Sequence, residues 1–471
     1  MTVILPAILL AAAGLLLLLL RLVNLKRDGV ALGVALGGLA AAALALALIR
    51  PPAWGLPYFD GTVTLDPAGF FLQFVVFGAT ALVLLLSWDY IREGGWGMTE
   101  YAALLLLATV GMVFLIISTD FLSLYVGLET MALASYVLAG YARGEGRSFE
   151  AAMKYFVLGA FSSAVLLYGI SLIYGATGTL NLIETARLLP TPPGKLYLAG
   201  MVMVACGMLF KVAAVPFHLW TPDVYQGAPT PITAFFSIGP KAAAFAAFLR
   251  IFSTAFGTTA REWSILLGLA CVLTMVAGNL MAIVQDNVKR MLAYSSIGSA
   301  GFVLLGLLAQ NTWGATGVLY YLFAYLFAIT GAFSVVLFLK TKEYGGERVD
   351  DFRGLSRRHP WIAFAMLVFL LSLIGVPGTA GFVGKFFLFG GAIQGGFILP
   401  AVIGILMSAV SAWYFFRLVV NMYIAPEEPE TERRGWPVVL AVGVCVAGTI
   451  LFGLWPMAVT RFLLETPLLA R

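Results

Sequence analysis

Long, unbroken apolar runs constrain the fold of this chain more than any other feature. The stretch 101–119, for example, holds no charged residue. A helix that spans the hydrocarbon core of a bilayer needs about 20 mostly apolar residues. Across all 471 residues, 61% are hydrophobic and only 11% are charged, against about 25% charged in a typical soluble domain. These values exclude a soluble enzyme, a disordered chain and a nucleic-acid-binding protein, and they predict a polytopic membrane protein.

The runs are continuous, whereas the strands of a transmembrane β-barrel alternate apolar and polar residues. We therefore predict an all-α membrane protein with about fourteen transmembrane helices. The expected helices cover residues 3–22, 29–49, 67–87, 99–117, 121–141, 149–175, 196–220, 229–255, 263–284, 291–309, 315–340, 360–394, 398–424 and 436–463.

The distribution of Lys and Arg over the loops predicts the topology. The odd-numbered loops hold seventeen basic residues and the even-numbered loops hold five. Basic residues collect in cytoplasmic loops, so the odd-numbered loops are expected on the cytoplasmic side. With fourteen helices, both termini would then lie on the opposite side of the membrane.

Two of the runs are interrupted by helix-breaking residues. The seventh contains Pro216, and the twelfth contains Pro377 followed by Gly378. Proline removes a backbone hydrogen bond and clashes with the preceding turn. Interrupted helices at corresponding places in two halves of a membrane protein indicate a transport site between inverted repeats.

Helices 7 and 12 are five helices apart, so two inverted five-helix units would place them at equivalent positions. The predicted organisation has four segments. They are residues 1–98 with helices 1–3, 99–262 with the first unit of helices 4–8, 263–425 with the second unit of helices 9–13, and 426–471 with helix 14.

Five ionisable residues lie far from any loop, and they are the candidate functional residues: Glu129, Lys154, Lys211, Lys241 and Lys385. A charge at the centre of a bilayer costs roughly 2.5–3.5 kcal/mol on insertion scales, and such residues commonly mark ion or proton pathways. The one acid cannot neutralise all the lysines. Because desolvation disfavours the charged form of a lysine, a surplus lysine in a dry site could take up and release protons.

Simpler interpretations remain open for these charges. Lys154 could reach the membrane surface or pair with Glu150 one helical turn away. The other four could form static ion pairs that hold helices together. His218 follows Pro216 in the interrupted helix, where it is either a packing residue or part of a proton relay. Asp223, in the proline-rich turn that follows, is expected to be solvated.

Redox cofactors are not expected in this chain. Its three cysteines stand alone in apolar runs, and its two histidines are far apart in the sequence. This pattern argues against an iron–sulfur cluster, a zinc site or bis-histidine haem ligation.

The segment 210–231, FKVAAVPFHLWTPDVYQGAPTP, resembles the antiporter-like membrane subunits of respiratory complex I, and within them the N type of NADH:quinone oxidoreductase. Supporting stretches are shared with multisubunit cation/proton antiporters and membrane-bound hydrogenases. They are GLET at 127–130, FEAAMKY at 149–155, KRMLAYSS at 289–296, DFRGL at 351–355 and GVPGTAGFVGK at 375–385.

The resemblance implies roles for the buried charges. Glu129 matches the helix 5 glutamate that pairs with a helix 7 lysine, here Lys211. Lys241 matches the central helix 8 lysine, and Lys154 matches a helix 6 lysine of the N type. Lys385 matches a helix 12 position that is lysine in the N and L types and glutamate in the M type, which speaks against the M type.

The resemblance further implies a non-redox, proton-translocating subunit in the membrane arm of a bacterial NADH:quinone oxidoreductase, in the cell inner membrane. Flavin, iron–sulfur clusters and quinone would belong to partner subunits, and the neighbours in the lipid bilayer would be of the K and M types. The alternatives are a subunit of a cation/proton antiporter, of a hydrogenase-type complex or of a complex that uses another electron donor, or else a structural spacer.

Overall fold

The structure is a computed structural model, and it describes residues 2–22, 28–49, 54–189, 192–340, 345–424 and 435–465. Some of the basic residues counted for the topology lie outside these ranges: Lys26, Arg27, Arg50, Lys342, Arg433 and Arg434.

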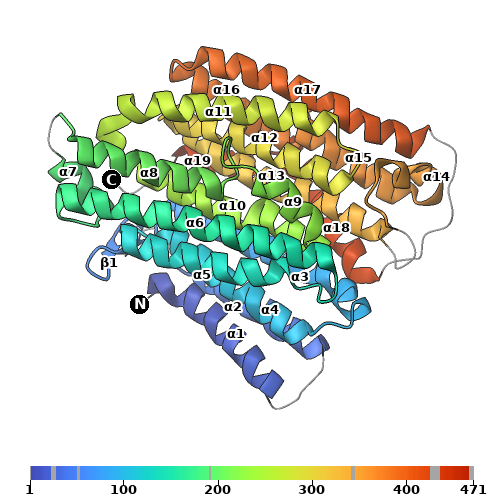
Figure 1. Cartoon of the computed structure of the whole chain (residues 1–471). Helices are drawn as coiled ribbons and strands as arrows, with labels where there is room; N and C mark the ends of the chain where they lie inside the picture. Colours follow the sequence, from blue (N-terminus) through green and yellow to red (C-terminus); the bar gives the residue numbers. More distant parts are fainter. Residues whose placement is uncertain are drawn as a thin grey trace.

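Long helices run side by side through the molecule (Figure 1). Within the described residues, twelve are long and apolar enough to cross a membrane, so the predicted polytopic all-α fold class is confirmed. These helices are α1 (Leu5–Leu22), α2 (Asp28–Ala47), α3 (Pro67–Glu93), α4 (Met98–Ile117), α5 (Phe121–Ala139), α6 (Gly146–Thr177), α10 (Thr230–Ser253), α11 (Ala260–Ile283), α12 (Val288–Leu308), α13 (Thr312–Leu339), α17 (Ile398–Tyr423) and α18 (Trp436–Leu454).

The remaining elements are short. They are α7 (Leu182–Leu188), α8 (Lys195–Lys211), α9 (Trp220–Gly227), α14 (Leu355–Arg358), α15 (Pro360–Ile374), α16 (Ala380–Gln394), α19 (Met457–Glu465), 3₁₀ turns at Thr2–Ile4, Gly257–Thr259 and Val349–Phe352, and an antiparallel pair of strands, β1 (Pro57–Tyr58) and β2 (Val63–Thr64). The count of fourteen spans, the inverted units and the four-segment division stay predictions.

At the first interruption, predicted helix 7 (residues 196–220) ends early, with α8 stopping at Lys211. The proline-rich segment after it, predicted to be a turn, instead begins with the helix α9. Residues 212–219 leave the helical path, and Pro216 lies in this break after a cis peptide bond from Val215. Ala213 has a φ of 60°, in the left-handed region that interrupts a right-handed helix. The Val215 amide donates instead to the Thr274 hydroxyl of α11, at 2.9 Å, so the break is tied to a neighbouring helix.

The second interruption divides predicted helix 12 into α15 and α16. Gly375 caps α15 with a φ of 90°, and Gly378 also has a φ of 90°. Glycine adopts this conformation without steric cost. Pro377 lies between them, and α16 resumes at Ala380. The last main-chain carbonyls of α15, at Leu373 and Ile374, therefore have no partner within their own helix and lie inside the bundle.

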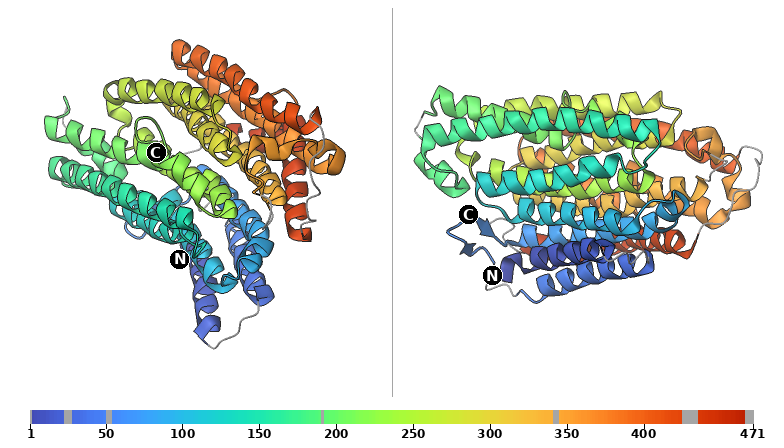
Figure 2. Two further views of the ribbon diagram at one scale, coloured as in Figure 1. Left: turned by 45° about the vertical axis from the view of Figure 1, so that its right-hand side comes forward. Right: turned by 60° about the horizontal axis from the view of Figure 1, so that its bottom comes forward.

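The centre of the bundle is formed by α10 and α12, in which every residue is buried except Ser253 of α10 and Arg290 of α12. The helices α1 and α2 lie at one edge and α17 at the opposite edge, in two views of the molecule (Figures 1 and 2). The end of the bundle at which α6 and α12 begin is called the basic end below. At the other end, Arg250 of α10 forms a buried 2.8 Å ion pair with Asp66, the N-cap of α3.

Candidate functional site

Four lysines are buried among the described residues: Lys211, Lys241, Lys289 and Lys385. Three of them, called the three buried lysines below, lie beside an irregularity of their helix. Lys211 is the last residue of α8, Lys241 follows Pro240 within α10, and Lys385 lies in the second turn of α16. Each of them is no more than 8% exposed. The sequence-predicted depth of these lysines therefore agrees with their position in the structure.

Lys211 lies at the first break, and its partner differs from the predicted one. Its Nζ donates to the Ser163 hydroxyl of α6 at 3.2 Å. Among the described residues, no carboxylate lies within 4 Å of this ammonium group. Glu129, on α5, is half-buried, and its Oε1 is buried without a hydrogen-bond partner. The structure therefore shows no direct contact between Glu129 and Lys211.

Lys241 lies at the centre of the bundle, where α10 faces α12. Its Nζ donates to the Ser296 hydroxyl at 2.6 Å and to the Ser296 main-chain carbonyl at 2.8 Å. Both contacts are neutral acceptors, which solvate an ammonium group without fixing its charge as a carboxylate would. The site can therefore hold the lysine in either protonation state.

Lys385 reaches back to the second break. Its Nζ donates to the main-chain carbonyls of Leu373 and Ile374, at 2.9 and 2.8 Å, and to the Ser408 hydroxyl at 2.8 Å. The carbonyls at the end of a helix have no intrahelical partner and carry a partial negative charge. The ammonium also lies 4.6 Å from the ring centre of Phe302 on α12, a cation–π geometry.

Lys154 occupies a different environment, near the basic end. Its side chain is 41% exposed and forms 2.7 Å ion pairs with both Glu150 and Asp223. The helix-surface pairing with Glu150 that the sequence allowed is therefore present in the structure. Lys154 does not join the three buried lysines.

The side chain of Asp223, expected to be solvated, is 35% exposed, and it also forms ion pairs that the sequence did not predict. Its second carboxylate oxygen accepts from Arg290 of α12 at 2.7 Å, so α6, α9 and α12 meet at one carboxylate. Sequence reasoning missed this pairing because the partners are 69 and 67 residues away along the chain.

His218 lies in the first break, as the sequence placed it. Its Nδ1 is buried and has no hydrogen-bond partner. Within the described part of the chain, it makes no hydrogen bond to any of the three buried lysines.

A family description that covers more than half of the chain fits this arrangement. The family "NADH:quinone oxidoreductase/Mrp antiporter, TM" matches residues 118–411. The chain belongs to this family. The matched region contains Glu129, the three buried lysines and both helix breaks.

Relatives in this family are similar over nearly the full chain. NADH-quinone oxidoreductase subunit N of Trichlorobacter lovleyi is 43% identical, over 98% of this chain and 96% of the relative. Subunit N of Paramagnetospirillum magneticum is 41% identical, over 96% of this chain and 94% of the relative. The predicted resemblance to the N type is thereby confirmed.

Solved structures agree with the fold. A chain of respiratory complex I from Thermus thermophilus is 35% identical, with a TM-score of 0.83 over 98% of this chain and all of that one. A chain of an archaeal membrane-bound sulfane sulfur reductase is 26% identical, with a TM-score of 0.85 over 97% and 96%. A chain of the Mrp complex from Dietzia, 21% identical with a TM-score of 0.86 over 98% and 96%, shares the fold.

The sequence did not predict the hydroxyl groups that lie near Lys241 and Lys385. Tyr321 donates to Ser299 at 3.1 Å on the side of α12 that carries Ser296, and Ser411 donates to the Ser408 carbonyl at 2.6 Å near Lys385. Ser296 and Ser299 are one helical turn apart in the sequence, which is the signal that could have indicated a polar face toward Lys241.

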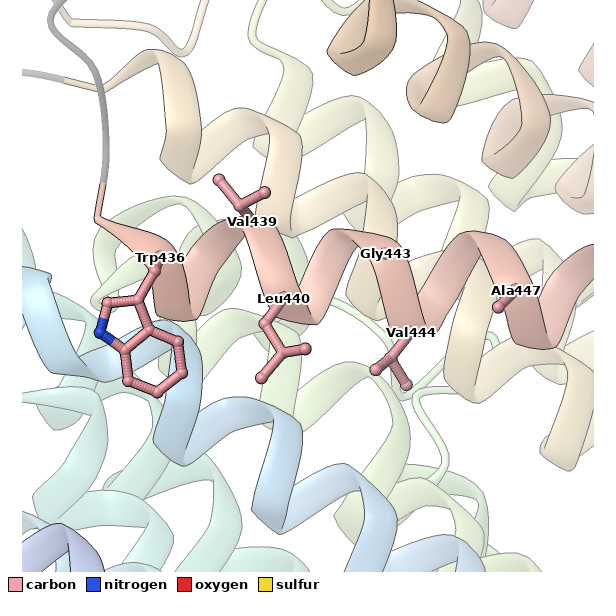
Figure 3. A pocket seen from close by; sticks show the side chains of 6 residues that line it. All are labelled: Trp436, Val439, Leu440, Gly443, Val444 and Ala447. Atoms are coloured by element: carbon pink, nitrogen blue, oxygen red, sulfur yellow. The ribbon is translucent and has the colours of Figure 1, made fainter.

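An open groove on the surface of the described chain lies apart from the lysines. It has a volume of about 750 Å³ and follows one face of α18 (Figure 3). Its lining is apolar: Trp436, Val439, Leu440, Gly443, Val444 and Ala447. It offers no group that could carry a proton.

Proposed function

We propose that this chain translocates protons as a non-redox membrane-arm subunit of a bacterial NADH:quinone oxidoreductase. The observation that carries the proposal is the presence of three buried lysines at helix irregularities, in a chain 43% identical to a subunit N over nearly its full length. Quinone reduction would take place in partner subunits, which would hold the flavin, iron–sulfur clusters and quinone. The neighbours would be of the K and M types.

The proposed location is the bacterial inner membrane, with the basic end toward the cytoplasm. The excess of basic residues in the odd-numbered loops supports this orientation. Both termini would then lie on the non-cytoplasmic side.

In the proposed mechanism, the charge of Glu129 controls the proton on Lys211. A carboxylate favours the protonated lysine, and its neutralisation or withdrawal favours proton release. Two unit charges 4 Å apart interact by about 4 kcal/mol at an effective dielectric constant of about 20. Glu129 is not in direct contact with Lys211 in this structure, so its approach and withdrawal would switch the lysine over part of this range.

The proton would then pass from Lys211 to Lys241 and on to Lys385. The neutral acceptors at Ser163, Ser296 and Ser408 support this step, because each can hydrogen-bond a lysine whether or not it is charged. Water at the breaks would bridge the spaces between the hydrogen-bonded groups. His218, with a free Nδ1 in the first break, is a candidate member of the relay.

The decisive experiment replaces Lys211 with alanine in the intact complex. NADH-driven proton pumping in membrane vesicles should be abolished or greatly reduced, while the variant subunit still assembles. Lys195→Ala is the matched control, because Lys195 is exposed at the start of the same helix. Normal pumping by the Lys211 variant would overturn the relay.

The proteins that bind this chain would distinguish a complex I subunit from an antiporter subunit. The 21% identity to the Mrp chain supports a common fold alone. Affinity purification from native membranes should recover flavin- and iron–sulfur-containing subunits; recovery of small antiporter subunits instead would replace our proposal. Normal pumping after joint neutralisation of Glu129 and Lys241 would favour a structural spacer.

A further inference from the structure

We propose that Asp223 is a positioning residue for Lys241. It would hold α12 against α9 so that Ser296 stays within hydrogen-bond reach of the Lys241 ammonium. The inference rests on the proposed proton-transfer function. It gives Asp223 a role in that function although Asp223 is not one of the three buried lysines or their direct partners.

The first step is the geometry at Asp223. Its Oδ2 accepts from Lys154 of α6 and its Oδ1 accepts from Arg290 of α12, both at 2.7 Å. The same Arg290 nitrogen also donates to Gln226 at 3.2 Å, one turn further along α9. Both oxygens are thus used, and one carboxylate joins three helices.

A second contact fixes the same helix end. Lys289, which precedes Arg290 on α12, is 1% exposed and donates to the Ala228 main-chain carbonyl at 2.8 Å. Ala228 is the C-cap of α9. Two consecutive residues of α12 therefore hold α9 at points five residues apart, which fixes its position along and around the axis of α12.

The third step connects this end to the buried lysine. Ser296 is six residues after Arg290 on α12, about 9 Å along a helix that rises 1.5 Å per residue. The helix continues without interruption to Leu308 and is buried throughout. A displacement at Arg290 is therefore transmitted to Ser296, and on to Phe302, which lies against Lys385.

The contacts close a ring. From Asp223 the chain passes through Ala228 into α10 and reaches Lys241, which contacts Ser296 of α12; α12 leads back to Arg290 and Asp223. The Lys241–Ser296 contact is 2.6 Å long, and a shift of about 1 Å would take it beyond hydrogen-bonding distance. The ring therefore links a partly exposed ion pair at the basic end to the centre of the bundle.

The test uses the intact complex in vesicles and compares Asp223→Ala, Asp223→Glu and Glu150→Ala. Glu150 is the matched control, since it lies 2.7 Å from the same Lys154, and within the described residues no hydrogen bond or ion pair joins it to α12. We expect Asp223→Ala to lower NADH-driven pumping several-fold and to shift its pH profile. Asp223→Glu should restore most of both, and Glu150→Ala should change neither.

A double variant separates positioning from simple structural support. If Asp223 acts through Ser296, then Asp223→Ala combined with Ser296→Ala should be no worse than the worse single variant. The proposal would be overturned if the loss of pumping in the double variant equalled the product of the two single losses. It would also be overturned if Asp223→Ala left pumping or its pH profile unchanged. If Asp223→Ala does not assemble, Arg290→Gln removes the same contact from the α12 side and is judged by the same readouts.

The two proposals fail separately. If Lys211→Ala pumps normally, the proton-transfer function itself is wrong. If Lys211→Ala stops pumping and Asp223→Ala leaves pumping and its pH profile unchanged, only the positioning role is wrong.

Discussion

Lys385 lies across the second helix break from Ile374, and its Nζ donates a 2.8 Å hydrogen bond to the Ile374 main-chain carbonyl. The break thus supplies the acceptors that a buried ammonium group needs, because the final carbonyls of α15 have no partner in their own helix. This relationship explains why a lysine is tolerated in α16 without a carboxylate beside it.

The first prediction concerns this contact. A positioned proton-transfer group contributes roughly 100-fold or more in rate, so Lys385→Ala should bring NADH-driven pumping close to the detection limit. Ser408→Ala should keep most of the activity, because the carbonyls of Leu373 and Ile374 still hold the ammonium. Pumping is followed with a pH-sensitive dye in inverted vesicles. Equal losses in the two variants would show that the serine, and not the carbonyl pair, is the essential acceptor.

The second prediction concerns the buried ion pair between Arg250 and Asp66. Removing one partner of a buried pair leaves an unpaired charge and typically costs about 3–5 kcal/mol. Asp66→Ala should therefore lower the free energy of unfolding by this amount, and it also removes the cap of α3 at the Gly69 amide. Replacing both residues, as in Asp66→Asn with Arg250→Met, should cost less than Asp66→Ala alone. Thermal unfolding in detergent measures the difference, and a double variant less stable than Asp66→Ala would contradict it.

The third prediction concerns the close approach of α18 to the second break. A Cβ on Gly453 would clash with the Gly378 carbonyl oxygen, whereas a Cβ on Gly443 would have no atom within 4 Å. Overpacking a tight contact costs about 1–3 kcal/mol. Gly453→Ala should therefore lower the thermal stability in detergent, and Gly443→Ala, on the same helix, should not. Similar stability of the two variants would mean that the break can move away from α18.

The fold could be predicted largely from the sequence, because helix length and apolarity are local properties. The breaks at Pro216 and Pro377 were placed correctly for the same reason: proline and glycine act on their own segment of chain. The depth of Lys211, Lys241 and Lys385 also followed from the apolar residues on either side of them.

The partners of these residues could not be predicted, because they depend on how distant segments pack. The sequence and the family resemblance paired Glu129 with Lys211, but the structure places the Ser163 hydroxyl at the ammonium. Asp223 was expected in solvent because its proline-rich segment was predicted to be a turn, but the structure places it in α9. Lys154 and Arg290 approach it from two other helices, which no local pattern indicates.

The last prediction concerns pH and the loop carboxylate Glu347. Burial alone would raise the pKa of Glu347, but the ammonium groups of Lys289 and Lys340, at 3.6 and 3.2 Å, outweigh this effect and lower it. Because the folded-state pKa is lowered, the stabilisation is fully present above the unfolded-state value of about 4.3. It is lost as the pH falls through the folded-state value.

Glu347→Gln should therefore be less stable than the unmodified chain at pH 7, since Lys289 remains buried without its counter-charge. The difference should shrink as the pH falls below about 4.3, where the carboxylate is progressively protonated. Thermal unfolding in detergent at pH values between about 3 and 7 measures this. Asp350→Asn is the control, because the Asp350 side chain is exposed and its ion pair is with the nearby Arg353. A Glu347 difference that stays constant over the whole range would show that packing, and not charge, is what Glu347 contributes.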